Sequence, residues 1–158
     1  MNKTNAMRIL DKAKIKYETL EYKHEVGSDF GESIARVLNL DPNTCLKSLV
    51  VSGNKDLYLC VIPVNKQLDE KKVASYLNIK SVEMYKTKDL LKAVGYQRGS
   101  VSPIGIKNIK KIFIDESVNN YEYVEVSGGT CGISLKINTK ELIDYLNLVV
   151  LDVVRDKE

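Results

Sequence analysis

The chain has 158 residues, of which 44% are hydrophobic and 28% charged, and its formal net charge is +3. These values suit a single domain over residues 1–158 with a hydrophobic core, and they argue against extended disorder. No apolar run approaches the ~20 residues of a membrane-spanning helix, and residues 1–6 lack the apolar core of a signal segment. We therefore expect a cytoplasmic protein with no membrane partner.

The first half of the chain alternates helix and strand patterns. Ala6, Ile9, Leu10 and Ala13 recur at helical spacing, which predicts a helix from about Thr4 to Lys14. The elements expected next are a strand over Tyr17–Lys23, a helix capped by Asp29 and ending near Asn39, and strands over Leu46–Ser52 and Leu57–Val64. The last two are nearly continuously apolar and flank turn residues, so they predict a hairpin buried in the centre of a sheet.

The second half begins with helical patterns and then becomes mostly β. The expected helices are capped by Asp69 and Thr87, the second stopping at Gly95, with a short strand near Ser81–Met84 between them. The later elements expected are strands over Ile112–Asp115, Tyr121–Val126, Gly132–Ile137 and Leu148–Val154, and a short helix capped by Thr139 and ending at Leu146. At least six strands with short helices among them predict a mixed α+β domain. Periodicity leaves open whether the sheet closes.

Several kinds of chemistry have no support in the sequence. The chain has one histidine, His24, and lacks the G-x-S-x-G, HExxH, Walker A and GxGxxG patterns. Its three cysteines, Cys45, Cys60 and Cys131, form no CxxC pair, so we expect reduced thiols with structural roles. We expect neither a metal nor a cofactor.

Lys47 is the first candidate functional residue. It lies near the start of a strand that should be buried, on the same face as Leu49 and Val51. Burying an unpaired ammonium is costly, so this lysine must either reach solvent at the strand end or line a cavity. In a cavity it could bind a carboxylate, a phosphate or a developing oxyanion.

Two glycine-containing segments are further candidates. Gly99–Gly105 combines glycines, serines and Pro103, and such a loop can direct backbone N–H groups at an acyl oxygen. Val126–Gly129 has the composition of a tight hairpin turn. Either segment could instead be an ordinary surface loop.

These three elements occur in order with further short motifs, and together they resemble the YbaK/EbsC family over nearly the whole chain. The further motifs are Tyr22-Lys23-His24, Phe30-Gly31-Glu32, Leu38–Pro42, Gln67–Ala74, Val82–Met84 and Gly95-Tyr96. The resemblance implies a mixed, barrel-like sheet flanked by short helices. It also implies a deacylase that clears Cys-tRNA(Pro), with Cys-tRNA(Cys) as a further substrate, tRNA as partner and prolyl-tRNA synthetase as a candidate second partner.

The resemblance also assigns roles to residues. Lys47 matches the family's lysine, Tyr22 and Phe30 match its pocket aromatics, and Gly99–Pro103 matches its glycine-serine-proline loop. The implied catalytic group is Lys47, Gly99 and Ser102, and the implied substrate contacts are Tyr22, Phe30, Ser100, Pro103, Ser127, Gly128, Gly129 and Ser134. After Gly128-Gly129 this chain has Thr130-Cys131, where the family often has a Lys-Arg pair.

The mechanism that the resemblance implies uses the substrate's own thiol. That thiol attacks the ester carbonyl, and the protein supplies position and oxyanion stabilisation. Two alternatives remain open from the sequence: an Ala-tRNA(Pro) deacylase that activates water, and a non-catalytic module that binds the tRNA end or a synthetase.

Overall fold

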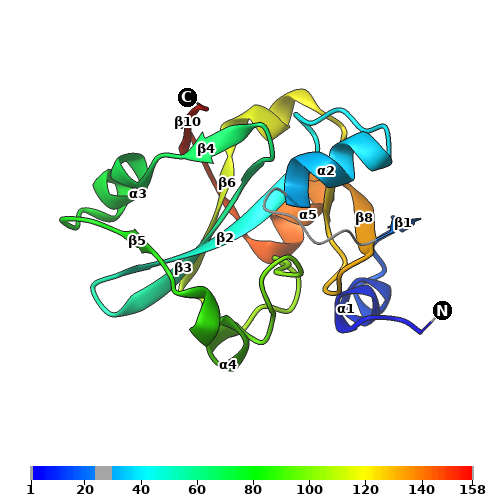
Figure 1. The fold of residues 1–158 in the computed structure, drawn as a ribbon, viewed down its shortest axis with the longest axis horizontal. Helices are drawn as coiled ribbons and strands as arrows, with labels where there is room; N and C mark the ends of the chain where they lie inside the picture. The colour runs from blue at the N-terminus through cyan, green and yellow to red at the C-terminus, as the bar shows by residue number, and fades with distance from the viewer. Residues whose placement is uncertain (1, 24–29, 158) are drawn as a thin grey trace.

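The structure is a computed structural model that describes residues 2–23 and 30–157, and it has the mixed α+β class expected from the sequence (Figure 1). The helices are α1 Asn5–Lys12, α2 Phe30–Val37, α3 Glu70–Leu77, α4 Leu90–Val94 and α5 Thr139–Leu146. The strands are β1 Tyr17–Glu21, β2 Leu46–Gly53, β3 Asp56–Pro63, β4 Lys66–Leu68, β5 Glu83–Met84, β6 Lys111–Asp115, β7 Tyr123–Ser127, β8 Ile133–Asn138, β9 Val149–Leu151 and β10 Val154–Asp156. In this described part of the chain, every helix is too short or too polar to cross a bilayer.

The largest sheet has the strand order β5-β2-β3-β6-β9, so the expected β2–β3 hairpin is confirmed and lies inside a sheet. A second, antiparallel sheet has the order β1-β8-β7, and β10 pairs with β4. An isolated bridge between Cys45 and Glu125 joins the two larger sheets, and the Glu125 N–H donates to the Thr44 carbonyl over 2.9 Å. The described strands therefore form adjoining sheets of a mixed α+β fold, and among them the question of closure is answered by the absence of a closed barrel.

The hairpin strands are apolar on both faces because each face packs against a different layer. Leu46, Val50 and Leu59 join a core shared with the second sheet, α1 and α5. Val51 and Tyr58 face a second core beneath α3. Burial on both faces explains why β2 and β3 lack the strict alternation of a half-exposed strand.

Capping residues account for most helix boundaries. Thr4 accepts from the Met7 N–H at the start of α1, and Asp69 caps α3 as expected. At α5 the cap is Asn138, which accepts from the Glu141 N–H, so the prediction of Thr139 as cap is off by one residue. The expected cap Asp29 lies outside the described residues.

The expected last strand is interrupted and becomes two. The buried Val153 donates its N–H to the Asp115 carboxylate over 3.2 Å, which ends the β9 ladder beside β6. The chain then turns, and β10 pairs with β4 with Val154 opposite Leu68. A specific side-chain acceptor causes this break, and β-propensity contains no signal of it.

Thr87, which was predicted to cap a helix, is instead the first residue of a 3₁₀ turn, Thr87–Asp89, that leads into α4.

Candidate functional site

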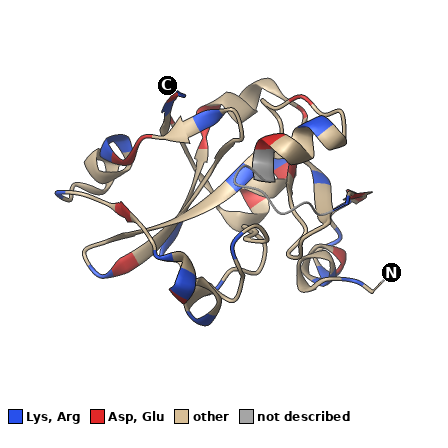
Figure 2. Cartoon of the chain, in the orientation of Figure 1, with Lys and Arg blue, Asp and Glu red and all other residues tan. Residues whose placement is uncertain are grey.

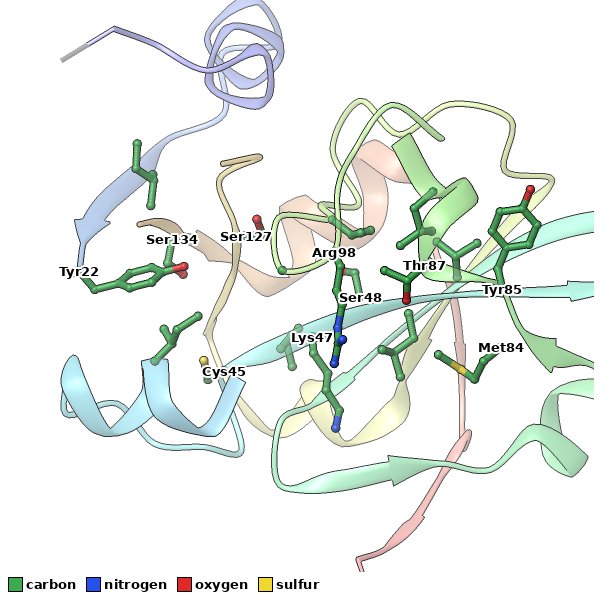
Figure 3. Close-up of a pocket in the computed structure, with 18 residues that line it drawn as sticks. Tyr22, Cys45, Lys47, Ser48, Met84, Tyr85, Thr87, Arg98, Ser127 and Ser134 are labelled. Atoms are coloured by element: carbon green, nitrogen blue, oxygen red, sulfur yellow. The ribbon is translucent and has the colours of Figure 1, made fainter. Parts of the chain in front are cut away.

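A cavity of about 530 Å³ opens where the first residues of β2 meet the loop after α4 and the β7–β8 turn (Figure 3). Its volume lies in the range typical of small-molecule sites, ~300–1,000 Å³. Five of the residues proposed from the sequence line it: Tyr22, Lys47, Gly99, Ser127 and Ser134. These come from five separate segments of the chain, so the fold gathers residues that lie more than 100 positions apart in the sequence.

The cavity exists because β2 has an incomplete strand partner on one edge. β5 pairs with β2 only at Val51 and Ser52, and the Tyr85 N–H adds one bond to the Val50 carbonyl over 2.9 Å. The preceding β2 residues 46–49 have no strand on this side in the described structure, and they line the cavity.

Lys47 occupies the cavity and not a solvent-exposed strand end. It pairs in register with Ile62 of β3, and its side chain is half-buried. Its side chain leaves the start of β2 and lines the cavity together with Arg98 (Figure 3). Of the two possibilities that the sequence allowed, a lysine that reaches solvent at the strand end or one that lines a cavity, the structure shows the second.

Gly99 lies in a tight turn that closes when the Ser100 N–H donates to the Gln97 carbonyl over 3.0 Å. Its φ of +86° is in the left-handed region, which explains why glycine is present. The Ser100 hydroxyl also donates to the Gln97 carbonyl, so it reinforces the turn and does not line the cavity. The turn fixes the Gly99 backbone at the cavity surface.

Ser127 connects the Gly99 turn to the β7–β8 turn. Its hydroxyl donates to the Ser100 carbonyl over 3.0 Å and accepts the Gly129 N–H over 3.1 Å. The single hydroxyl proton is thus already used, and what Ser127 can offer a ligand is a lone pair. Ser134 is similar, since its hydroxyl donates to the Val126 carbonyl over 3.1 Å. Both serines hold the cavity in shape.

The other loop residues proposed from the sequence are buried supports outside the cavity lining. Ser102 is fully buried and accepts the Ile104 N–H over 3.2 Å, and Pro103 is also buried. At Gly129, which has a φ of +96°, an added Cβ would lie 3.2 Å from the Tyr96 ring. The Tyr96 hydroxyl in turn donates to the Ile104 carbonyl, so Tyr96 fastens the loop to the turn.

One end of the cavity is formed by Tyr22, Cys45 and Ser134 (Figure 3). Burial raises the pKa of the Tyr22 phenol, an effect partly offset by a backbone hydrogen bond with Gly132. Burial also raises the pKa of the Cys45 thiol to about 12. Both groups are therefore neutral at physiological pH. Phe30 begins α2, but its side chain lies outside the described part of the structure.

Glu125 is a buried carboxyl group next to this end, with only 4% of its surface exposed. Its Oε2 atom has no hydrogen-bond partner among the described residues. Burial raises the pKa of Glu125, while a hydrogen bond from Thr44 and the charge of Lys136 act in the opposite direction. The folded protein thus binds a proton here more tightly than the unfolded chain.

This raised pKa gives a testable pH dependence. A carboxyl whose pKa is raised on folding makes its most favourable contribution at low pH and loses it as the pH rises through the folded pKa. We expect Glu125→Gln to become more stabilising relative to wild type between pH 4.5 and pH 8, as measured by urea unfolding. The same change at exposed Glu116 is the control for losing a charge. A difference between wild type and Glu125→Gln that is constant with pH would contradict the expectation.

Several cavity residues were missed in the sequence analysis. Arg98, Ser48 and Cys45 each lie within two positions of a proposed residue, and that adjacency was the available signal. Met84, Tyr85 and Thr87 also line the cavity. A strand of two residues gives too little pattern to distinguish a ligand-facing side chain from a core-facing one.

Among the described residues, no three His, Cys, Asp or Glu side chains form a group that could hold a metal ion.

A family model of the aminoacyl-tRNA editing domain matches residues 24–145. A protein of Enterococcus faecalis named "Putative Cys-tRNA(Pro)/Cys-tRNA(Cys) deacylase EbsC" is 35% identical over 146 residues, covering 92% of this chain and 89% of that protein. The chain belongs to the aminoacyl-tRNA editing domain family.

Other similarities of this editing domain agree with the family. A proline–tRNA ligase of Thermosipho melanesiensis is 27% identical over 108 residues, which are 61% of this chain and 19% of the ligase. A solved structure described as "a putative trans-editing enzyme for prolyl tRNA synthetase" superposes with a TM-score of 0.82 at 20% identity, covering 98% of this chain and 99% of that one. At that identity the likeness shows the editing-domain fold.

Proposed function

We propose that this editing domain deacylates Cys-tRNA(Pro), with Cys-tRNA(Cys) as a further substrate, and that the cavity binds the acylated 3′ adenosine. The supporting observation is that Lys47 and the Gly99 turn, which the sequence placed 52 positions apart, line the same cavity as Tyr22. Lys47 contacts the terminal nucleotide or the oxyanion, and the Gly99 backbone holds the acyl carbonyl. The Tyr22 end receives the aminoacyl group.

The proposed reaction uses the thiol of the cysteinyl group as nucleophile. The sulfur forms a bond to the ester carbonyl carbon, and the bond from that carbon to the tRNA 3′-terminal oxygen breaks. The thiol proton ends on the released tRNA hydroxyl, and the cysteine leaves as a cyclic thioester that water then opens. The protein contributes orientation, for which ~7–11 kcal/mol is available in favourable cases, and oxyanion stabilisation.

Two of the protein's own thiols are unsuited to act as nucleophiles, and the third lies outside the cavity lining. Burial raises the pKa of both Cys45 and Cys60 to about 12, so both remain protonated, and a thiol must ionise to attack. Cys131 is exposed on the β7–β8 turn. These properties support a scheme in which the substrate supplies the sulfur.

We expect iodoacetamide to modify one cysteine, Cys131, in the folded protein, and all three after unfolding in urea. Mass spectrometry of the intact protein counts the additions, and Cys131→Ser should take up no label while folded. A folded variant with Cys45, Cys60 and Cys131 all replaced should keep its turnover. Loss of turnover in that variant, with the circular dichroism spectrum unchanged, would refute the substrate-thiol scheme.

The experiment that tests the function is a deacylation assay with purified protein. Cys-tRNA(Pro) should be cleaved much faster than Ala-tRNA(Pro), since the alanyl ester has no thiol. Equal rates for the two esters would indicate an activated water, and the alternative hydrolytic mechanism would then hold. Binding of the tRNA end with no cleavage of either ester would mark a non-catalytic module.

In this proposal the cavity recognises the acylated 3′ end, so discrimination between different tRNA bodies must come from another part of the system. Lys and Arg residues are interspersed with Asp and Glu on α2, α3 and the β2–β3 hairpin (Figure 2). Because phosphate contacts drive general tRNA affinity, an interspersed surface favours recognition of the acylated end over the body. We propose prolyl-tRNA synthetase as the partner that presents the correct tRNA. Adding the synthetase should raise the preference for Cys-tRNA(Pro) over Cys-tRNA(Cys).

A further inference from the structure

The cavity has a second end, which none of the roles above uses. Met84, Tyr85 and Thr87 form this end, and they lie on the far side of Lys47 from Tyr22 (Figure 3). Met84 ends β5, Tyr85 follows it directly, and Thr87 begins the next 3₁₀ turn. The aminoacyl end and this end are thus separated by the cationic middle of the cavity.

The middle of the cavity carries two positive charges from the described residues. Lys47 and Arg98 both line it, and the described lining residues include no Asp or Glu. Arg98 is exposed, and it makes no ion pair with the residues that the structure describes. It also immediately precedes Gly99, so the turn that positions the acyl carbonyl positions this guanidinium as well. An arginine in this setting is suited to bind a phosphate.

The second end has the properties of a platform for a nucleobase. Met84 is 47% exposed, which is unusual for methionine in a strand. Tyr85 packs against the main core, and its N–H donates to the Val50 carbonyl, so both its side chain and its backbone are anchored. The Thr87 hydroxyl adds a polar group beside this apolar surface. Unpaired bases bind to such surfaces by stacking, with polar groups at their edges.

We infer that Arg98, Met84, Tyr85 and Thr87 form a subsite for the nucleotide that precedes the acylated adenosine. Arg98 binds the phosphate that joins the two nucleotides, and the preceding base lies against Met84 and Tyr85. This phosphodiester joins the acylated adenosine to the preceding nucleoside and so lies between them, which matches a cation between the aminoacyl end and the second end of the cavity. The inference rests on the proposed function, because it takes the aminoacyl group to be at the Tyr22 end.

The test compares two small substrates, cysteinyl-adenosine and the cysteinyl ester of the dinucleotide cytidylyl-adenosine. Wild-type protein should cleave the dinucleotide ester with a kcat/KM higher by roughly 5–150-fold, the range expected for one stacked base. Arg98→Ala and Met84→Ala should each lose most of this advantage while cleaving cysteinyl-adenosine at the wild-type rate. Arg8→Ala, which removes an exposed arginine on α1, is the matched control and should keep the advantage.

Salt dependence separates a phosphate contact from a structural effect of Arg98. Each phosphate neutralised on a single strand contributes about 0.7 to the slope of log affinity against log salt concentration. The slope for binding of a non-cleavable dinucleotide analogue should therefore decrease by about that amount in Arg98→Ala and stay unchanged in Met84→Ala. An unchanged slope in Arg98→Ala would overturn the phosphate contact.

The remaining outcomes distinguish the subsite from the function. If wild-type protein cleaves both esters equally, or if both variants keep the dinucleotide advantage, the subsite is wrong and the deacylase function stands. If Arg98→Ala impairs both esters equally, Arg98 acts at the acyl end and the subsite is again wrong. If wild-type protein cleaves neither ester nor Cys-tRNA(Pro), the proposed function fails and the subsite fails with it.

Discussion

Lys47→Ala should lower kcat/KM for Cys-tRNA(Pro) by about 10²–10³-fold, the loss that follows removal of one preorganised oxyanion donor. The ammonium is held at the start of β2, beside a cavity whose described lining contains no Asp or Glu. Its replacement removes half of the positive charge that the described lining presents to the substrate. Single-turnover deacylation at fixed ionic strength measures the effect directly.

Two further variants are needed to interpret the loss of activity expected in Lys47→Ala. Lys47→Met keeps a long apolar stem and removes the charge, so it should lose as much activity as Lys47→Ala. Lys80→Ala, at an exposed position outside the cavity, should retain wild-type activity. Wild-type turnover in a folded Lys47→Ala protein would refute the assignment of Lys47 to the reaction.

The second large effect is expected at Gly128, in the turn between β7 and β8. A Cβ at this position would lie 2.7 Å from Cγ2 of Ile133 and 3.1 Å from its carbonyl oxygen, which accepts the Gly128 N–H. Overpacking of this kind costs about 1–3 kcal/mol. Gly128→Ala should lower the free energy of unfolding by that amount in urea titrations. It should also lower deacylation, because the displaced turn carries Ser127 and its bond to the Ser100 carbonyl.

A double-mutant cycle locates the origin of this cost. Ile133→Ala removes the methyl group that the new Cβ meets, so Gly128→Ala should cost less in the Ile133→Ala background than in wild type. The two changes should be non-additive by 0.5 kcal/mol or more, on the order of the coupling seen between contacting residues. Strict additivity would show that the glycine is required for another reason.

Much of the fold could be predicted from local patterns. The β2–β3 hairpin and the cap at Asp69 follow from apolar runs, turn residues and side-chain acceptors. The split of the last strand could not be predicted, since it depends on the Asp115 carboxylate, 38 positions earlier in the chain. Pairing of β1 with β8 is equally invisible to local pattern, because it joins the two ends of the sequence.

The site could be predicted in part, and mainly through the resemblance. Lys47 stood out physically as a charge in an apolar strand, whereas Gly99 and Ser127 were individually as consistent with ordinary turns. The structure separates residues that line the cavity from those that hold it, such as Ser102, whose hydroxyl accepts a backbone N–H. Residue identity alone cannot make that distinction, because the same serine side chain can either line a cavity or support it. Arg98 and Met84 became candidates only when the fold placed them beside Lys47.

The order of the strands in the second sheet affects when the protein can work during its own synthesis. Tyr17 of β1 pairs with Ile137 of β8, so β1, the first strand to be synthesised, cannot form its sheet until β8 has been synthesised. Ser127 and Ser134, which complete the cavity, also belong to that late segment. A nascent chain that has emerged from the ribosome only as far as β6 therefore has no editing pocket. Activity should appear abruptly, once the residues through Asn138 are free to fold, and such long-range pairing predicts slow folding.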